Sequence, residues 1–336
     1  MSHLQRLLGI FVTLFTLGAF LAVAGGLWAV YEFRKPGAYS QSIMLDVPSG
    51  TGVRTLANDL AEAGAINAPL VFVAGAMLAG SHTKIKAGEY EFAPHLSQRD
   101  ILDKLVKGDV VKRQVTVREG LTSYEVVELL KTVSDLTGEL TTIPAEGALL
   151  PETYTYRKDQ TREATLAEMQ AAMQKTVTEL CPKQPCWPEP LKSLDEVMTL
   201  ASIVEKETGV AEERKRVAGV FLNRLKQNMA LQTDPTVIYA ITKGRHKNDG
   251  QGPLGRRLLS KDLEFDSPYN TYKYPGLPPG PIANPGRASI EAVLQPEVHD
   301  YIYFVADGSG GHIFAKTLAE HNKNVAEWRK IRRSQP

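Results

Sequence analysis

An uncharged stretch near the N-terminus constrains this chain more than any other feature of its sequence. Residues 7–31 read LLGIFVTLFTLGAFLAVAGGLWAVY, and none of these 25 residues carries a charge. A helix needs about 20 apolar residues to cross a bilayer. Trp28 and Tyr31, near one end of the stretch, are typical of the aromatic side chains found at membrane interfaces. The stretch therefore predicts a membrane-spanning helix at 7–31.

A cleaved signal peptide is the alternative explanation, because the small residues AVA at 22–24 resemble a cleavage site. Apolar character continues for seven residues beyond that point, which favours a retained anchor. The charges give little information on orientation, since Arg6 flanks one end of the stretch and Glu32, Arg34 and Lys35 flank the other. A short tail at 1–6 followed by a long remainder predicts a single-pass inner-membrane protein, with a cytoplasmic N-terminus and a periplasmic or otherwise extracytoplasmic body.

The composition excludes several classes of partner. Of 336 residues, 43% are hydrophobic and 23% charged, which is enough for two or three packed domains. The formal net charge is +1, whereas nucleic-acid binders usually carry a strongly basic face. The sequence has no CxxC, HExxH, P-loop or GxGxxG motif. His312 and His321 are too far apart in sequence for a usual metal-ligand pair. We therefore expect no nucleic acid, metal or cofactor.

The two cysteines of the chain, Cys181 and Cys186, lie close together in CPKQPCW. No histidine or further cysteine is near enough to complete a zinc site. Outside the cytosol, a small disulfide-closed loop is reasonable. Two free thiols remain the alternative.

Periodicity and turn residues divide the rest of the chain and predict a mixed α+β fold. After a linker at 32–44, the segment 45–108 alternates short strands with amphipathic helices, and Ser97 is expected to cap one of them. From 109 to 330 the chain alternates helices with loops rich in proline and glycine. The sequence ends with a strand-like YIYFVA at 301–306 and a helix from about Leu318.

Two glutamates in SIVEKETGV (202–210) are the first candidates for chemistry. They follow an apolar helix that Ser193 is expected to cap, with Glu196 completing a capping box. Glu205 and Glu207 are about 200° apart around that helix, so they cannot face the same cleft. Glu207 lies in the last turn, where the helix dipole and apolar neighbours raise a carboxyl pKa from about 4.3 towards the ~6 of a general acid. This geometry favours Glu207 and leaves Glu205 open.

Eight blocks in chain order carry a resemblance to a known family. They are KAGEYEF (86–92), EGALLPETY (146–154), ASIVEKET (201–208), VFLNRL (220–225), LQTDPTVIYA (231–240), YNTY (269–272), GLPPGPIANPG (276–286) and YFVADGSGGHIF (303–314). Together they make the sequence similar to the MltG (YceG-like) family of membrane-anchored endolytic murein transglycosylases. The resemblance implies a transmembrane helix, a LysM-like subdomain at 45–108 and a catalytic domain at 109–330. The loop at 244–263 looks longer and more basic than in the family.

The resemblance places the catalytic glutamate at Glu207, followed by the hydroxyl residue Thr208, with Glu205 as the fallback. The implied reaction breaks the β-1,4 bond between N-acetylmuramic acid and N-acetylglucosamine in glycan strands. Glu207 would protonate the leaving oxygen and then accept the proton of the muramoyl C6 hydroxyl, which attacks C1 and closes a 1,6-anhydro ring. Water is not a reactant, so the second carboxylate of ordinary glycosidases is not needed.

Four side chains are candidates for holding the sugar. Gln232 precedes a helix that Asp234 and Pro235 are expected to begin, with Asp234 as N-cap. In YNTY, the amide of Asn270 can donate and accept hydrogen bonds, and the ring of Tyr272 can stack on a pyranose. Tyr154 is the fourth candidate. For each of them, packing within a loop or scaffold is the competing explanation.

The expected partners are peptidoglycan strands, the cell membrane and, by resemblance, a peptidoglycan synthase of the penicillin-binding-protein type whose nascent strands the enzyme would terminate. A non-catalytic peptidoglycan-binding or scaffold protein of the wall-synthesis machinery is the main alternative, although it leaves ASIVEKET without a role. A pyridoxal-phosphate lyase would need a Schiff-base lysine and a cytosolic location, which the N-terminal stretch opposes.

Overall fold

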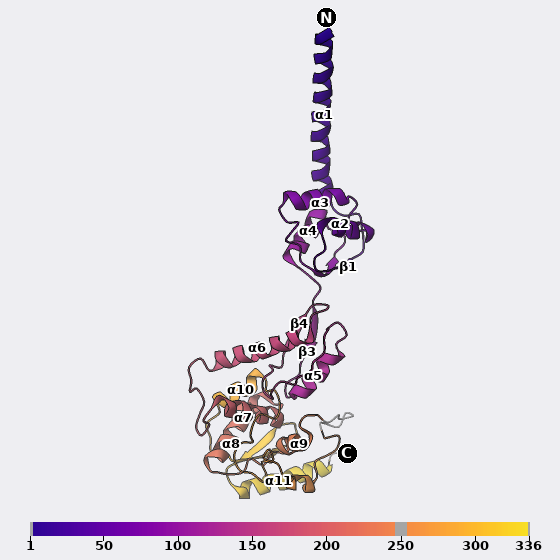
Figure 1. Ribbon diagram of the computed structural model, residues 1–336. Helices are drawn as coiled ribbons and strands as arrows, with labels where there is room; N and C mark the ends of the chain where they lie inside the picture. The colour runs from indigo at the N-terminus through magenta and orange to yellow at the C-terminus, as the bar shows by residue number, and fades with distance from the viewer. Residues whose placement is uncertain (1–2, 246–253, 335–336) are drawn as a thin grey trace. The chain divides into compact units, whose positions relative to one another are not determined.

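The computed structural model describes residues 3–245 and 254–334 (Figure 1). The chain forms two compact units, Met1–Arg113 and Gln114–Pro336. Residues 246–253, within the basic loop at 244–263, lie outside the described residues. Helices and short strands alternate in both units, so the predicted mixed α+β class is confirmed.

The first unit begins with α1 (His3–Arg34), which extends beyond both ends of the uncharged stretch. Its segment Ile10–Arg34 has a mean hydropathy of 2.2, and it is the one helix of the described residues that is long and apolar enough to cross a membrane. Arg34 is its last residue. Just before the helix end, Glu32 is buried and pairs with Lys35 at 2.6 Å.

A small α+β core follows in the same unit. The strands β1 (Ile43–Val47) and β2 (Gly88–Phe92) pair antiparallel, with Leu45 opposite Tyr90. The helices α2 (Val53–Glu62), α3 (Pro69–Leu78) and α4 (Gln98–Lys107) enclose them. The hydrophobic cluster contains large side chains from each of these three helices and from β2: Leu56, Leu60, Phe72, Tyr90, Phe92, Ile101 and Leu105.

Ser97 caps α4 as predicted. Its hydroxyl accepts the Asp100 N–H at 3.1 Å, and the Asp100 carboxylate accepts the Ser97 N–H at 3.3 Å. This reciprocal pair satisfies two of the backbone donors that a helix start leaves free. Gly108 ends the helix in the left-handed conformation, φ 72°, which glycine adopts without steric cost.

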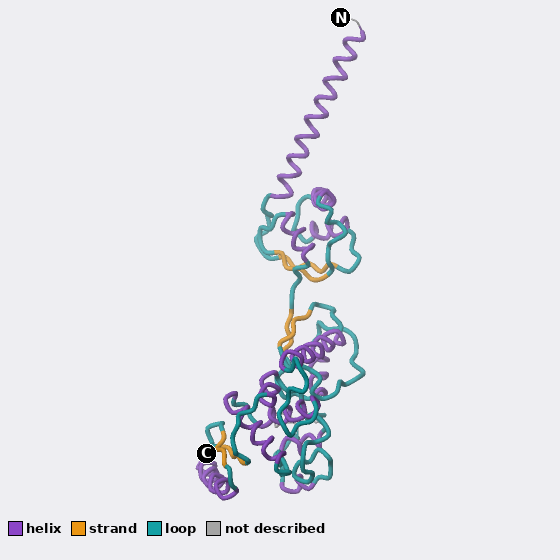
Figure 2. Tube along the Cα trace, turned by 90° about the vertical axis from the view of Figure 1, so that its left-hand side faces the viewer, coloured by secondary structure: helices purple, strands orange, loops and turns teal. Residues whose placement is uncertain are grey.

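In the second unit helices predominate over strands, and the strands pair two by two (Figure 2). In chain order its elements are β3 (Arg113–Thr116), α5 (Ser123–Thr132), β4 (Thr153–Tyr156), α6 (Arg162–Leu180), α7 (Leu194–Glu207), α8 (Arg214–Lys226), α9 (Asp234–Thr242), α10 (Arg287–Leu294), β5 (Tyr303–Ala306), β6 (His312–Ala315) and α11 (Leu318–Ser334). The expected C-terminal strand and helix correspond to β5 and α11.

Helix α7 lies among α8, α9 and α10, as Figure 1 shows. Every residue from Val197 to Val204 is buried, which is the pattern of a helix enclosed by protein on all sides. Ser193 begins the helix by accepting the Glu196 N–H at 3.2 Å. The predicted capping box is incomplete, because the Glu196 carboxylate accepts the N–H of Lys192 and not that of Ser193.

Cys181 and Cys186 form a disulfide, with their Cα atoms 5.5 Å apart. The bridge closes the turn that follows α6, and Cys181 packs in the hydrophobic cluster around α7. Of the two alternatives for these thiols, the structure has the bonded one.

Candidate active site

Glu207 is the last residue of α7, in agreement with the expectation that it lies in the last turn of this helix. The eight buried residues before it fix the helix in the core, so its side chain is held by a rigid element. Thr208 leaves the helix with an extended backbone. Its hydroxyl accepts the Val210 N–H at 3.0 Å, which orders the turn directly after the carboxyl.

The Thr233 hydroxyl donates a hydrogen bond to Oε1 of Glu207. Thr233 occupies the N-cap position of α9, yet its side chain makes no capping bond to that helix. The prediction that Asp234 is the N-cap is therefore wrong by one residue, because Asp234 is already helical. A hydroxyl that ordinarily satisfies a helix start is instead directed at the carboxyl.

The environment raises the pKa of Glu207, and burial of its carboxyl is the largest cause. A buried carboxylate loses its hydration, so the neutral acid is favoured. The Thr233 hydrogen bond lowers the pKa in opposition, and the negative charge of Asp234 raises it further. The net direction is that of a general acid, which must hold its proton until the leaving group needs it.

Two basic side chains influence the same carboxyl. The positive charges of His312 and Arg224 both lower the pKa of Glu207, although they do not outweigh burial. Arg224 is only 8% exposed, and it donates to the Ile302 carbonyl at 2.6 Å and the Leu231 carbonyl at 2.8 Å. His312 bonds the Glu213 carboxylate at 2.8 Å. A positive charge at either position favours the ionised carboxylate of Glu207 over the neutral acid.

Arg224 was missed by the sequence analysis, although it lies within one of the quoted blocks. Its neighbours Phe221, Leu222 and Leu225 belong to the hydrophobic cluster of the unit. A charged residue between apolar helix positions was the available signal, because arginine is rarely buried unless it is paired.

Glu205 faces a different part of the unit. Its Oε2 accepts the Gly286 N–H at 2.9 Å, one residue before α10, and its Oε1 lies 3.7 Å from the Arg214 guanidinium. The side chain is 4% exposed. The expectation that the two glutamates point apart is confirmed, and the contacts of Glu205 are those of a residue that ties α7 to α10.

The loop around YNTY is joined to the start of α9 through Thr271. Its backbone carbonyl accepts the Gln232 N–H at 3.2 Å, and its hydroxyl accepts the Thr233 N–H at 3.1 Å. The same hydroxyl bonds Thr236 at 2.8 Å. Through these contacts Thr271 fixes the backbone of Thr233, whose hydroxyl bonds Glu207. Thr271 was not among the residues selected from the sequence.

Two of the predicted sugar-binding residues lie beside this junction. The Tyr272 hydroxyl donates to the Asp234 carboxylate at 2.7 Å, and burial together with this bond raises its pKa. Nearby negative charge, including that of Glu207, acts in the same direction. Gln232 is exposed, with φ at 51°. Tyr272 is therefore within electrostatic reach of Glu207, and Gln232 directly precedes Thr233, which bonds Glu207.

The other two predicted residues are enclosed. Asn270 is 0% exposed and donates to the carbonyls of Leu263 and Phe265, both at 2.8 Å, while its oxygen accepts the Tyr272 N–H at 3.0 Å. Tyr154 packs in a hydrophobic cluster formed with β3, α5 and α6, and its hydroxyl donates to the Leu150 carbonyl at 2.6 Å. The polar atoms of both side chains thus form hydrogen bonds with the protein backbone.

Glu146 is a second carboxyl with a raised pKa, and it was not predicted from the sequence. Burial raises the pKa of Glu146 to about 7, and Glu146 accepts the Ser123 N–H at 2.8 Å at the start of α5. It borders a cavity of about 550 Å³ that is also lined by Tyr239, Lys243 and Arg245. A strongly perturbed pKa at a cavity is a recognised signal of function, so Glu146 competes with Glu207 for the role of acid.

No three His, Cys, Asp or Glu side chains of the described residues are grouped so that they could hold a metal ion. The geometry thus brings together one carboxyl with a raised pKa, a hydroxyl that donates to it and a nearby buried cation. These are the kinds of group that general acid–base catalysis uses.

The chain belongs to the YceG-like family, whose profile matches residues 45–327. It is 34% identical over 314 residues to the endolytic murein transglycosylase of Bacillus subtilis, covering 84% of this chain and 83% of that protein. It is 31% identical to the endolytic murein transglycosylase of Streptococcus pneumoniae, covering 85% of this chain but only 58% of that longer protein. These relatives are enzymes of the lyase type.

A solved structure agrees with the family assignment. The crystal structure of a putative YceG-like protein from Listeria monocytogenes matches with a TM-score of 0.51 and 34% identity, covering 84% of this chain and 99% of that one. The resemblance deduced from the eight sequence blocks is thereby confirmed.

Proposed function

We propose that this chain is an endolytic peptidoglycan lytic transglycosylase that uses Glu207 as its general acid and base. The observation that supports the proposal is the raised pKa of Glu207 at the end of a buried helix, with Thr233 bonded to its carboxyl. The curated relatives carry the name of this activity. Glu207 is preferred to Glu146 because it is the glutamate on which the family's catalytic position falls.

In the proposed reaction, neutral Glu207 donates its proton to the oxygen that links C1 of N-acetylmuramic acid to N-acetylglucosamine. The C1–O bond breaks, and the C6 hydroxyl of the same muramoyl residue forms a new bond to C1. The C6 hydroxyl proton passes to the Glu207 carboxylate, which restores the acid. One bond is exchanged for another and no water is consumed, so one carboxyl is sufficient.

Some neighbours of Glu207 favour its protonated form, and others favour its carboxylate. Burial and the charge of Asp234 favour the protonated acid before bond cleavage. The Thr233 hydroxyl and the charges of Arg224 and His312 favour the carboxylate afterwards. The opposing influences keep the free energies of the two states close, which a group that gives and then recovers a proton requires.

Gln232 and Tyr272 are proposed as sugar contacts, because Gln232 directly precedes Thr233, Tyr272 is within electrostatic reach of Glu207, and neither side chain is fully buried. Asn270 and Tyr154 are assigned supporting roles. Asn270 orders the loop that carries Tyr272, and Tyr154 holds the packing of β4.

The proposed location follows from α1. The helix would anchor the protein in the inner membrane with a cytoplasmic N-terminus and a periplasmic or otherwise extracytoplasmic body. The α+β core at 45–108 would act as a LysM-like module. Cleavage within nascent strands would terminate their elongation, and a penicillin-binding-protein-type synthase would be the partner that supplies them.

Product analysis tests the proposal. The full chain would be incubated with purified peptidoglycan, and its products separated and weighed. Internal fragments with 1,6-anhydro-muramic acid ends support the lytic reaction. Reducing ends formed by water would show hydrolysis instead. Binding without cleavage would support the alternative, a peptidoglycan-binding or scaffold protein.

A further inference from the structure

Helix α3 exposes large apolar side chains although its unit has a well-packed core. Leu70 is 84% exposed and Leu78 90% exposed, and Met77 is also open to solvent. The whole helix, PLVFVAGAML, lacks a charged residue. Within the described residues 36–113, the one other large apolar side chain of comparable exposure is Met44. A gathered apolar surface of this kind marks an interaction site.

The exposed helix packs against the end of α1. The Phe33 ring lies so close to Gly75 of α3 that a Cβ on this glycine would meet ring carbons. Phe33 precedes Arg34, the last residue of α1. Since α1 is proposed to leave the membrane near this point, α3 lies at the level of the lipid surface.

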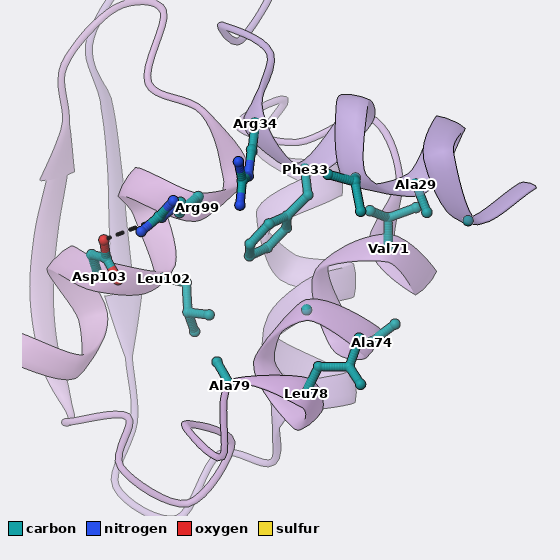
Figure 3. A pocket seen from close by; sticks show the side chains of 13 residues that line it. Ala29, Phe33, Arg34, Val71, Ala74, Leu78, Ala79, Arg99, Leu102 and Asp103 are labelled. Carbon is teal, nitrogen blue, oxygen red and sulfur yellow. Dashed lines mark ion pairs between the residues drawn. The ribbon is translucent and has the colours of Figure 1, made fainter. Parts of the chain in front are cut away.

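A pocket of about 580 Å³ lies between α1, α3 and α4 (Figure 3). Along α1 its lining runs from Gly26 to Arg34, a rise of about 12 Å. The end near Ala29 is apolar, whereas Arg34 and Arg99 lie together at the other end, as Figure 3 shows. The pocket therefore changes from apolar to basic along the direction in which a bilayer changes from acyl chain to headgroup.

The charges at the basic end are incompletely paired. Arg99 is 4.0 Å from the Asp103 carboxylate, and both side chains are more than half exposed. Arg34 is exposed and has no ion pair within residues 3–245 and 254–334. Two guanidinium groups against one carboxylate leave a net positive charge, which complements a phosphodiester, and arginine binds phosphate in a bidentate manner.

We propose that this pocket binds an acidic phospholipid of the membrane that α1 crosses, with the phosphate at Arg34 and Arg99 and an acyl chain along Phe33, Leu78 and Leu102. Leu70 and Leu78 then enter the lipid surface, as the apolar face of an interfacial helix does. The N-terminal unit is thereby held on the membrane by a second contact. The inference rests on the proposed membrane anchoring by α1.

The experiment uses the full chain reconstituted in lipid vesicles. Both native cysteines are bonded to each other, so a cysteine introduced by Leu78→Cys can be labelled selectively with a fluorophore. Met44→Cys provides the matched control, because Met44 is exposed on β1 of the same unit. Vesicles contain phosphatidylcholine with increasing fractions of phosphatidylglycerol, and a nitroxide on the acyl chains serves as quencher.

The proposal predicts strong quenching of the label at position 78 and little at position 44, with quenching that increases with phosphatidylglycerol. Arg34→Gln and Arg99→Gln should each raise the half-maximal phosphatidylglycerol fraction about fivefold, the effect of one arginine near an acidic surface. Arg54→Gln, which removes an exposed charge from α2, should leave it unchanged.

Equal quenching at positions 44 and 78 would overturn the proposal. Quenching that is independent of phosphatidylglycerol, or arginine variants that match Arg54→Gln, would overturn the assignment of an acidic lipid. Extraction of the protein from vesicles by alkaline carbonate would contradict the anchoring itself. A protein that resists extraction while its label at 78 stays unquenched would contradict the lipid pocket alone.

Discussion

The Thr233 hydroxyl donates to the Glu207 carboxyl from the N-cap position of a helix that it does not cap. Helix α9 thus begins without a side-chain capping bond. The loss of such a bond typically lowers the stability of a protein by about 1 kcal/mol. The hydroxyl acts on the proton affinity of a carboxyl on α7. The contact joins the end of one buried helix to the start of another.

Thr233→Val should raise the pKa of Glu207 further, because it removes the hydrogen bond that lowers it. A hydrogen bond to a charged group contributes about 1.5–3 kcal/mol, so the alkaline limb of kcat/KM should move upward by about one to two pH units. The alkaline limb of kcat/KM reports the pKa of the catalytic acid in the free enzyme. A pH–rate profile of the variant checks this.

Asp234→Asn is the opposing control. Its charge raises the pKa of Glu207, so the neutral amide should move the alkaline limb downward, while the amide oxygen can still accept the Tyr272 hydroxyl. Profiles that move in the same direction for both variants would show that Glu207 is not the group that titrates.

Glu207→Gln should stabilise the folded protein at neutral pH. The folded state raises the pKa of Glu207 above its ordinary 4.5, so the folded chain binds more protons than the unfolded one above that pH. Stability from this group is complete below pH 4.5 and declines as pH rises through the folded-state pKa. Glutamine stays neutral at every pH, so the Tm of the variant at neutral pH should be higher than that of wild type.

The comparison of Tm values must be repeated in acid, where wild type and Glu207→Gln should converge because both are neutral there. A difference in Tm that is constant across pH would indicate a packing effect and contradict the raised pKa.

Glu205→Ala should destabilise the protein without removing the chemistry. The substitution removes the carboxylate that accepts the Gly286 N–H, and it leaves Arg214 with the Glu119 carboxylate at 3.4 Å. A buried backbone N–H that loses its acceptor costs about 1–3 kcal/mol. Denaturant unfolding would give the stability, and the activity of the remaining folded fraction should stay within about tenfold of wild type. Loss of all activity in a folded Glu205→Gln protein would return the catalytic role to Glu205.

The disulfide should make a moderate contribution to stability. A closed loop as short as Cys181–Cys186 contributes about 2 kcal/mol in the chain-entropy account. Replacing both cysteines by serine should lower Tm without a change in kcat, since the bridge is not among the contacts of Glu207. Alkylation of the unreduced native protein should add no mass, and the addition of two labels would contradict the bridge.

The sequence predicted the secondary structure well where the signal was local. The cap at Ser97, the position of Glu207 in the last turn of α7 and the uncharged stretch within α1 all depend on neighbours in the chain. Asp234 was misplaced as a cap because the sequence does not show that the hydroxyl of Thr233 has a partner on α7.

The site was predictable only in part, because burial depends on contacts distant in sequence. The periodicity of α7 separated Glu205 from Glu207, and both lie as expected. Asn270 was selected for its hydrogen-bonding capacity, but it uses that capacity for carbonyls of its own loop. Arg224 and Glu146 were missed because their neighbours in space come from other segments.

The most direct test of the central claim is mass spectrometry of peptidoglycan digested by the full chain and by its Glu207→Gln and Glu146→Gln variants. Wild type and Glu146→Gln should release internal fragments with 1,6-anhydro-muramic acid ends, and Glu207→Gln should lower their rate of formation by about 10²–10⁴-fold. Undiminished anhydro products from a folded Glu207→Gln protein, or their loss from a folded Glu146→Gln protein instead, would contradict that claim.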